Sequence, residues 1–284
     1  MTAQSARVAI VTDSTSYLPA ELVAAHGIRV VPLQVVVGGV AHDEGGEATS
    51  AMVAEALRSW TPITTSRPSP AAFLAAYEAA AASGCDGIVS VHLSADMSGT
   101  HESAALAARE APVPTRVVDS RSLGMGLGFA VVSAAETAAG GGSVDDCAAV
   151  ASKRAAASTA VFYVDTLEHL RRGGRIGAGA ALLGSALAVK PLLHLVDGRI
   201  EALEKVRTSA RAIARLEEIA LRHAGAAEVD VAVAHLAAPD RAQVLAERLR
   251  ARLPRLGELY VSEVGAVVGA HVGPGMLSVV VAPR

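Results

Sequence analysis

The sequence predicts an α/β protein of two domains: a parallel α/β domain at the N-terminal end and an α+β domain with a mixed sheet at the C-terminal end. The length of 284 residues, at about 150 residues per domain, favours two domains. In the first half, strand patterns alternate with helical patterns, which indicates a parallel sheet. In the second half, Asp197-Gly198 lies between two strand patterns and indicates antiparallel pairing. We expect domains at residues 1–157 and 158–284.

The first domain is expected to open with a strand, a polar loop and a helix. Val8 to Val11 is a short β-branched run, Thr12 to Ser16 is the loop, and Pro19 precedes the helical segment. Residues 28–37 form a continuous apolar run that Pro32 interrupts, which predicts one strand covered on both faces.

The alternation of strands and helices continues to the predicted boundary. Ser69 followed by Pro70 marks a helix start, since Ser caps a helix and Pro suits its first position. The later elements of this half are predicted at residues 87–93 (strand), 102–109 (helix), 116–118 (strand), 123–139 (helix) and 144–157 (connecting helix).

The second domain is organised around a predicted hairpin. Asp197-Gly198 suits a two-residue type I′ turn between strands at 192–196 and 199–203. The other predicted elements are strands at 159–164, 229–235, 259–263 and 277–281, and helices at 167–172, 210–223 and 240–253.

Composition excludes several classes of protein. Hydrophobic residues make up 51% and charged residues 19% of the chain, so disorder is excluded. The formal net charge of −3 lacks the basic footprint of a nucleic-acid-binding protein. The start of the chain predicts no signal peptide, and the uncharged stretch at 176–189 is shorter than the roughly 18 to 20 residues of a spanning helix. With 2 cysteines and no CxxC pair, the chain is expected in a reducing cytoplasm.

Motifs of several common enzymes are absent from the sequence. It contains no P-loop and no dinucleotide-binding glycine pattern. Ser98 is no nucleophile elbow, because Asp96 stands where the first Gly should be. The 9 histidines form no zinc-binding pattern. We therefore expect no metal site and no bound cofactor.

Hydroxyl groups gather where predicted strands end, at residues 12–16, 64–66, 94–100 and 119–122. The carboxyl ends of parallel strands meet at one edge of a sheet, where hydroxyl and N–H donors suit a carboxylate or a phosphate. The alternative for each loop is that its Ser, Thr or Asp is a helix N-cap.

Three further features have both a binding and a structural interpretation. His271 lies among glycines in a predicted loop that turns tightly and exposes the imidazole, or it is an incidental surface residue. Arg207 follows the hairpin and can reach an anion, or it is a solvated charge. Residues 170–177 form a basic contact loop, or a helix that ends at Gly with cations at its negative end.

Taken together, these residues resemble the DegV family along nearly the whole chain. The collinear motifs lie at residues 8–15, 65–70, 93–100, 166–167, 173–176, 190–191, 205–208 and 271–275. The resemblance implies two α/β domains with a long-chain fatty acid bound between them. It also implies the role of the fatty-acid-binding subunit of a bacterial fatty acid kinase. Such a subunit is no catalyst on its own and presents the acyl carboxylate to a separate ATP-dependent kinase subunit.

The resemblance also implies roles for single residues. Thr65 and Ser98 would hold the carboxylate by hydroxyl donation, with His271 as a further polar partner, and Arg207 would assist phosphoryl transfer by neutralising charge. The implied ligand-binding set is Thr65, Ser66, Ser98, Gly99, Thr100 and His271. Arg67 stands where the family usually has Gln, and it either adds a cation near the head group or points to solvent.

Two other functions remain open at this point. Ser98 with His271 would serve a hydrolase, although the sequence specifies neither a third residue nor an oxyanion hole. A lipid carrier or sensor without a kinase partner is the other.

A chain rich in Ala, Val, Leu and Gly can line an acyl tunnel, where burying about 15 methylenes at roughly 0.8 kcal/mol each gives ample gross affinity.

Overall fold

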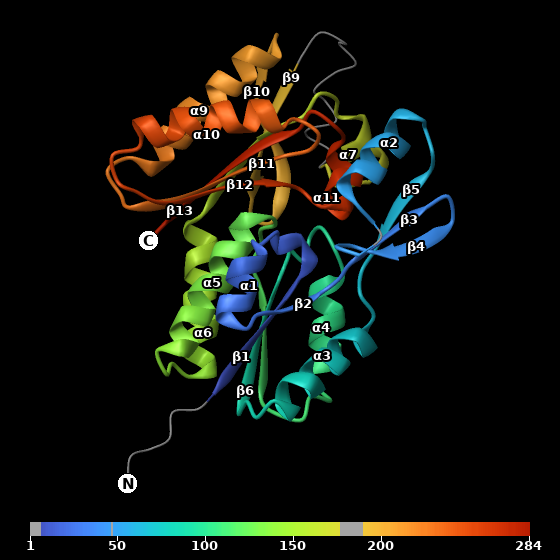
Figure 1. The fold of residues 1–284 in the computed structure, drawn as a ribbon, viewed down its shortest axis with the longest axis vertical. Coiled ribbons are helices and arrows are strands. Elements are labelled where there is room, and N and C mark those ends of the chain that lie inside the picture. Colours follow the sequence, from blue (N-terminus) through green and yellow to red (C-terminus); the bar gives the residue numbers. More distant parts are fainter. Residues whose placement is uncertain (1–6, 47, 177–189) are drawn as a thin grey trace. The chain divides into compact units, whose positions relative to one another are not determined.

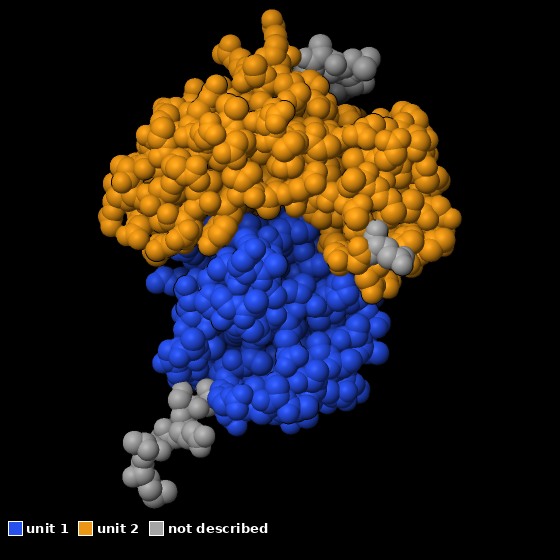
Figure 2. Space-filling view, in the orientation of Figure 1, with its two compact units in different colours: residues 1–33, 67–156 blue, residues 34–66, 157–284 orange. Residues whose placement is uncertain are grey.

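The computed structural model describes residues 7–46, 48–176 and 190–284 (Figure 1). They fall into two units (Figure 2). Unit 1 consists of residues 1–33 and 67–156, and unit 2 of residues 34–66 and 157–284. The division after residue 156 lies next to the boundary expected from the sequence. Residues 34–66 differ from that expectation, because they are part of unit 2.

Unit 1 is built on a parallel sheet of four strands in the order β2-β1-β6-β7. Helices α3 and α4 pack on one face, and α5 covers the other with α1 beside it (Figure 1). The predicted parallel α/β domain is confirmed. Its elements are β1 (Val8–Asp13), η1 (Ser14–Ser16), α1 (Ala20–His26), β2 (Arg29–Val31), α3 (Pro70–Ala82), β6 (Gly87–His92), α4 (Thr100–Ala108), β7 (Thr115–Asp119), α5 (Met125–Ala139) and α6 (Val144–Ala157).

Local signals set the start and the buried face of helix α3. Ser69 is its N-cap and accepts a hydrogen bond from the backbone N–H of Ala72 at 3.2 Å, as predicted. Phe73 and Tyr77, one turn apart, are buried against β6 together with Ile88. The helix thereby anchors one side of the unit 1 core.

Unit 2 contains a mixed sheet of six strands in the order β10-β9-β8-β13-β11-β12, in which only the β11–β12 pair is parallel. The predicted mixed sheet is confirmed. Helices α9 and α10 pack on the sheet and complete its core. Its elements are β8 (Thr159–Tyr163), α7 (Glu168–Arg172), β9 (Lys190–Val196), β10 (Arg199–Val206), α9 (Ser209–Ala224), β11 (Val229–His235), α10 (Pro239–Arg252), β12 (Leu256–Glu263), α11 (Ala266–Val272) and β13 (Leu277–Pro283).

The predicted hairpin of unit 2 is confirmed by its turn geometry. Asp197 and Gly198 have φ values of 50° and 81°, which a type I′ turn requires at both central positions. The antiparallel pairing of β9 with β10 therefore follows from two residues of local sequence.

Residues 34–66, the inserted segment of unit 2, form a second, antiparallel sheet in the order β4-β3-β5. Its strands are β3 (Gln34–Val37), β4 (Val40–Asp43) and β5 (Ile63–Ser66), and helix α2 (Ser50–Arg58) precedes β5. No element was predicted for residues 38–62. Thr49 is the N-cap of α2 and accepts a hydrogen bond from Met52 N. A Thr at this position is a helix-start signal that the sequence contains.

The prediction of one strand over residues 28–37 is wrong. The run contains two strands in two different sheets, β2 in unit 1 and β3 in unit 2. Pro32 separates them, because proline has no N–H to donate to a strand ladder. The next residue, Leu33, donates its N–H to the Ser14 hydroxyl at 3.0 Å instead.

The described residues contain no helix that is both long and apolar enough to cross a membrane. The uncharged stretch considered in the sequence, 176–189, lies outside the described residues from position 177 onward.

Candidate functional site

Loops of unit 1 meet at the carboxyl edge of its parallel sheet. Backbone hydrogen bonds join Ser94 N to Ser122 O at 2.9 Å and Ser120 N to His92 O at 3.0 Å. Gly124 N donates to Thr15 O at 2.8 Å. The loops at 12–16, 94–100 and 119–122 thus converge as expected. The expectation for residues 64–66 is wrong, because they lie on strand β5 in an antiparallel sheet of unit 2.

The Ser98 hydroxyl lies at this edge and does not act as a helix cap. Helix α4 starts at Thr100 with Gly99 as its N-cap, and no side chain caps it. The Ser98 Oγ atom lies 2.9 Å from Thr100 Oγ1. Ser98 is half-buried and Thr100 is buried. The Ser98 hydroxyl thus pairs with the Thr100 hydroxyl, and the helix-cap interpretation of this loop does not apply to Ser98.

Arg67 packs over Gly99, and this close approach depends on the glycine. A Cβ atom at Gly99 would lie 1.8 Å from Arg67 Nη1. The same Nη1 donates to Glu102 Oε2 at 2.8 Å and reaches Gly99 O at 3.4 Å. Both charged side chains are about half exposed or more, so the ion pair contributes about 0–1 kcal/mol. Arg67 therefore brings a cation to the residue next to Ser98.

Thr65 and His271 form the second group of predicted residues, in unit 2. Thr65 Oγ1 lies 2.9 Å from His271 Nε2, although 206 positions separate them in the chain. Ser66 follows Thr65 on strand β5, where alternation directs its side chain to the opposite face, and it is exposed. The structure therefore joins Thr65 with His271 and leaves Ser66 out of this pair.

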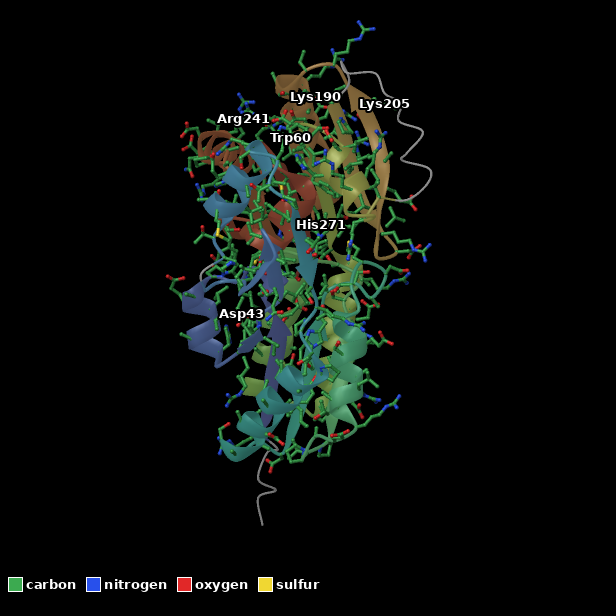
Figure 3. The ribbon with its side chains drawn as sticks, turned by 90° about the vertical axis from the view of Figure 1, so that its right-hand side faces the viewer. Asp43, Trp60, Lys190, Lys205, Arg241 and His271 are labelled. Carbon is green, nitrogen blue, oxygen red and sulfur yellow. The ribbon has the colours of Figure 1, made fainter. Side chains whose placement is uncertain are left out.

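The expectation that His271 lies in a loop and is exposed is wrong. His271 is in the last turn of helix α11 (Figure 3), and its side chain is half-buried. The predicted tight turn follows the helix, where Gly273 and Gly275 have φ values of 75° and 87°. Gly173 lets the ring approach, because a Cβ atom there would lie 2.1 Å from His271 Nδ1. Gly173 thus allows close packing against the imidazole, whereas Gly273 and Gly275 allow the turn.

Burial also sets the charge of His271. Burial, with the nearby positive charge of Arg175, lowers its pKa from 6.5 to about 4. The imidazole is therefore neutral near pH 7. A neutral ring beside a hydroxyl can share in binding a carboxylate without forming a full ion pair.

The inserted segment of unit 2 holds helix α11 at its start. The buried Glu44 carboxylate accepts the N–H of Val267 at 2.7 Å, which suits an anion at a helix N-terminus. Ser50 Oγ donates to Val264 O at 2.7 Å. Sequence reasoning missed Glu44, because its partner lies 223 positions away.

Arg207 is exposed and lies between β10 and the N-cap of α9, Thr208. It makes no hydrogen bond or ion pair with any residue in the described ranges. The structure does not join it to Thr65 or His271. Arg207 is thus a solvated charge, as one of its two interpretations predicts, and it is accessible to a second molecule.

The basic segment at 170–177 is arranged as a helix end over its described part. Helix α7 has Gly173 as its C-cap, and Arg175 Nη1 donates to Gly173 O at 2.5 Å. Arg172 pairs with Glu168 at 2.5 Å and lies 4.9 Å from the ring centre of Trp60. Gly177 lies outside the described residues.

Within the described ranges, no group of three or more His, Cys, Asp or Glu residues is arranged to hold a metal ion. The predicted site residues with polar side chains, which are Thr65, Ser66, Ser98, Thr100, His271 and Arg207, offer hydroxyls, an imidazole and a guanidinium group. Their chemistry is that of anion recognition.

The stability of the protein is expected to fall on acidification, with a contribution from His271. The unfolded chain binds a proton at this residue below about pH 6.5, whereas the folded protein does so only near pH 4. His271 therefore does not lower the free energy of unfolding above pH 6.5, and it lowers that free energy progressively from pH 6.5 to pH 4. Urea unfolding at pH 7.0, 5.5 and 4.5 measures it in the wild type and in His271→Asn. The variant should lose less stability over this range, and equal losses would contradict the burial of the imidazole.

The chain is similar to proteins of the DegV family along nearly its whole length. The model of the family described as "Uncharacterised protein, DegV family" matches residues 7–284. A DegV domain-containing protein of Streptomyces coelicolor is 62% identical over 280 residues, which cover 99% of this chain and 100% of the relative.

Two solved structures share the fold. One is of a DegV family protein from Thermus thermophilus, described by its fatty acid binding, with a TM-score of 0.92, 34% identity, and coverage of 98% of this chain and 100% of that chain. The other is DegV of Bacillus subtilis, described as a fatty acid binding protein, with a TM-score of 0.90, 35% identity, and coverage of 99% and 100%.

Proposed function

The chain belongs to the DegV family, and from this premise we propose that it binds a long-chain fatty acid. The observation that supports the proposal most is the likeness, over nearly the whole chain, to two solved structures whose descriptions name fatty acid binding. The neutral pair of Thr65 and His271 adds chemical support, because a hydroxyl and an imidazole N–H are donors that suit a carboxylate.

Carboxylate binding is assigned in this proposal to Thr65, Ser98 and His271, with Gly99 and Thr100 shaping the loop around Ser98. The hydrocarbon supplies most of the gross affinity, about 12 kcal/mol for about 15 methylenes. Ordering and association costs offset much of it. Hydrocarbon burial does not distinguish one end of the ligand from the other, so the polar residues determine its direction.

The finer part of the proposal is that the protein presents the acyl carboxylate to a separate ATP-dependent kinase subunit. Arg207 supports it, because this cation is exposed at the end of a strand and accessible to a second protein. Charge accumulates on the head group during phosphoryl transfer, and a guanidinium stabilises it there. In this proposal Arg207 assists transfer within the partner complex.

Protein purified from cells without denaturation is expected to contain a fatty acid, because a tightly bound apolar ligand dissociates slowly. Native mass spectrometry should show an added acyl mass, and organic extraction should recover the acid. A delipidated sample should regain thermal stability with palmitate or oleate. Recovery of no acyl chain, together with no thermal shift, would overturn the proposal.

The hydrolase alternative has less support than binding. The Ser98 hydroxyl is engaged by Thr100, and His271 Nε2 by Thr65, so each already has a partner other than the one a Ser–His dyad requires. Turnover of a p-nitrophenyl ester that Ser98→Ala abolishes would revive it. A lipid carrier or sensor is distinguished from a kinase subunit by whether a cognate kinase phosphorylates the bound acid.

A further inference from the structure

A chain of fully buried polar side chains crosses the core of unit 1, and none of them belongs to the ligand-binding set. Tyr77 OH donates to Ser90 Oγ at 2.9 Å, and Ser90 Oγ lies 2.6 Å from His92 Nε2. His92 Nδ1 lies 3.0 Å from Asp13 Oδ2. All of these side chains are 0% exposed. Phe73 packs edge-on against the His92 ring at 4.8 Å and keeps the surroundings apolar.

The order Ser90, His92, Asp13 resembles the hydrogen-bonded series of a hydrolytic triad. A nucleophile needs access to a substrate, however, and the Ser90 hydroxyl is sealed beneath helices α3 and α4. Its oxygen also accepts a hydrogen bond from the Tyr77 hydroxyl. Burial raises the pKa of Tyr77 to about 12. The series therefore has a use other than nucleophilic catalysis.

The donors around Asp13 define its charge. Its Oδ2 accepts the N–H of Leu93 at 3.0 Å, and its Oδ1 accepts both the N–H and the hydroxyl of Thr15 at 3.0 and 2.5 Å. These three donated hydrogens stabilise the ionised form of the carboxyl, which can only accept. His92 Nδ1, the remaining group facing this carboxylate, must therefore carry a proton.

The other ring nitrogen of His92 is fixed by the same count of protons. Tyr77 donates to Ser90 at 2.9 Å, a shorter contact than its 3.4 Å to Ala104 O. Ser90 must then use its own proton as the donor to His92 Nε2. His92 is thus the neutral tautomer with hydrogen on Nδ1, and every donor in the series points toward Asp13.

This series leads directly to the loop that holds Ser98. Leu93 N donates to Asp13, and each following N–H of the loop up to Ser98 also donates a hydrogen bond, with Asp96 N donating to Ser94 Oγ. Ser94 N donates to Ser122 O, Ala95 N to Asp119 Oδ1, and Met97 N and Ser98 N to Ser94 O. The bond from Asp13 to Leu93 is thus the first in an unbroken set that places the Ser98 hydroxyl.

We propose that Asp13 and His92 are positioning residues for Ser98. Asp13 holds Leu93 at the start of the loop, and His92, fixed as its Nδ1–H tautomer by Ser90 and Tyr77, holds the Asp13 carboxylate in place. Neither residue touches the ligand. The consequence for binding rests on the proposed function, because it concerns the grip of Ser98 on a carboxylate.

Asp13→Asn tests this proposal, since an amide group is the same size and presents N–H to His92 Nδ1. The His92 tautomer is measured by nitrogen-15 NMR at pH 7, and the Leu93 to Ser98 amides by hydrogen exchange. We expect a switch to the Nε2–H tautomer and exchange that is roughly tenfold faster or more in this loop. Asp86→Asn is the matched control, because Asp86 accepts Arg7 N at 2.8 Å in the same unit, and it should change neither readout.

Ligand binding separates this proposal from the proposed function. Asp13→Asn should weaken palmitate binding roughly tenfold and leave hexadecanol, which has no carboxylate, unchanged. If the wild type binds no palmitate, the proposed function fails while the tautomer and exchange readouts still decide the positioning role. Unchanged exchange in folded Asp13→Asn would overturn the proposal. If that variant fails to fold, the wild type decides: the Nε2–H tautomer or an imidazolium at pH 7 overturns it.

Discussion

Thr65→Ala and Ser98→Ala are each expected to weaken palmitate binding by about 1.5 to 3 kcal/mol, roughly 10- to 150-fold. Each substitution removes a hydroxyl donor to a charged group. Thr65 Oγ1 is bonded to His271 and Ser98 Oγ to Thr100, so both hydroxyls have defined positions. Isothermal titration of delipidated protein measures the loss.

Thr64→Ala is a matched control for Thr65→Ala. Thr64 is the preceding residue on strand β5, so its side chain lies on the opposite face, and it is exposed. Its substitution should leave the affinity unchanged. If Thr65→Ala and Ser98→Ala both bind and melt like the wild type, the carboxylate is bound elsewhere.

Arg207→Ala is expected to slow acyl-phosphate formation by about 10² to 10³ while fatty acid binding stays close to that of the wild type. The guanidinium is exposed and makes no bond within the described ranges that its loss would break. In its proposed role it acts where negative charge develops, in the transition state of transfer. A reconstituted assay with a cognate kinase, ATP and Mg²⁺, run beside direct binding, measures both quantities.

Two variants sharpen this experiment. Arg250→Ala removes another exposed arginine, on helix α10, and should change neither quantity. His271→Ala should reduce both, because the imidazole helps to position the acid itself. Equal losses of binding and turnover in Arg207→Ala would assign the residue to ground-state binding, and full turnover would remove it from the reaction.

Features of the fold that depend on neighbouring residues could be predicted from the sequence. The cap at Ser69 and the type I′ turn at Asp197-Gly198 each act within a few residues, and both are found where expected. Helix α11 was missed because Gly269 and the glycines after it resemble a loop. A Cβ atom added at Gly269 would lie 3.3 Å from the Leu236 side chain and 3.7 Å from the Val53 side chain. This glycine therefore serves packing within the helix and does not mark a loop.

Contacts between distant residues account for what the sequence did not show of the candidate site. Only the family resemblance joined Thr65 to His271, and nothing in the periodicity of either segment indicates their contact. The buried series of unit 1 did leave a signal. Ser90 and His92 are polar residues on alternate positions of an otherwise apolar strand, and such positions need buried partners.

The order in which the ribosome makes this chain has a consequence for the segment at 34–66. Synthesis proceeds at about 5 to 20 residues per second, so roughly 10 to 40 s pass between Thr65 and its partner His271, which are 206 residues apart. Unit 1 is complete once residue 156 has emerged, whereas β3, β4 and β5 wait for helix α11 near the end of translation. The nascent chain thus carries this segment for most of its synthesis without helix α11, which contacts β3 and β5 in the complete protein. A truncated product that stops after unit 1 is expected to be a substrate for chaperones and proteases.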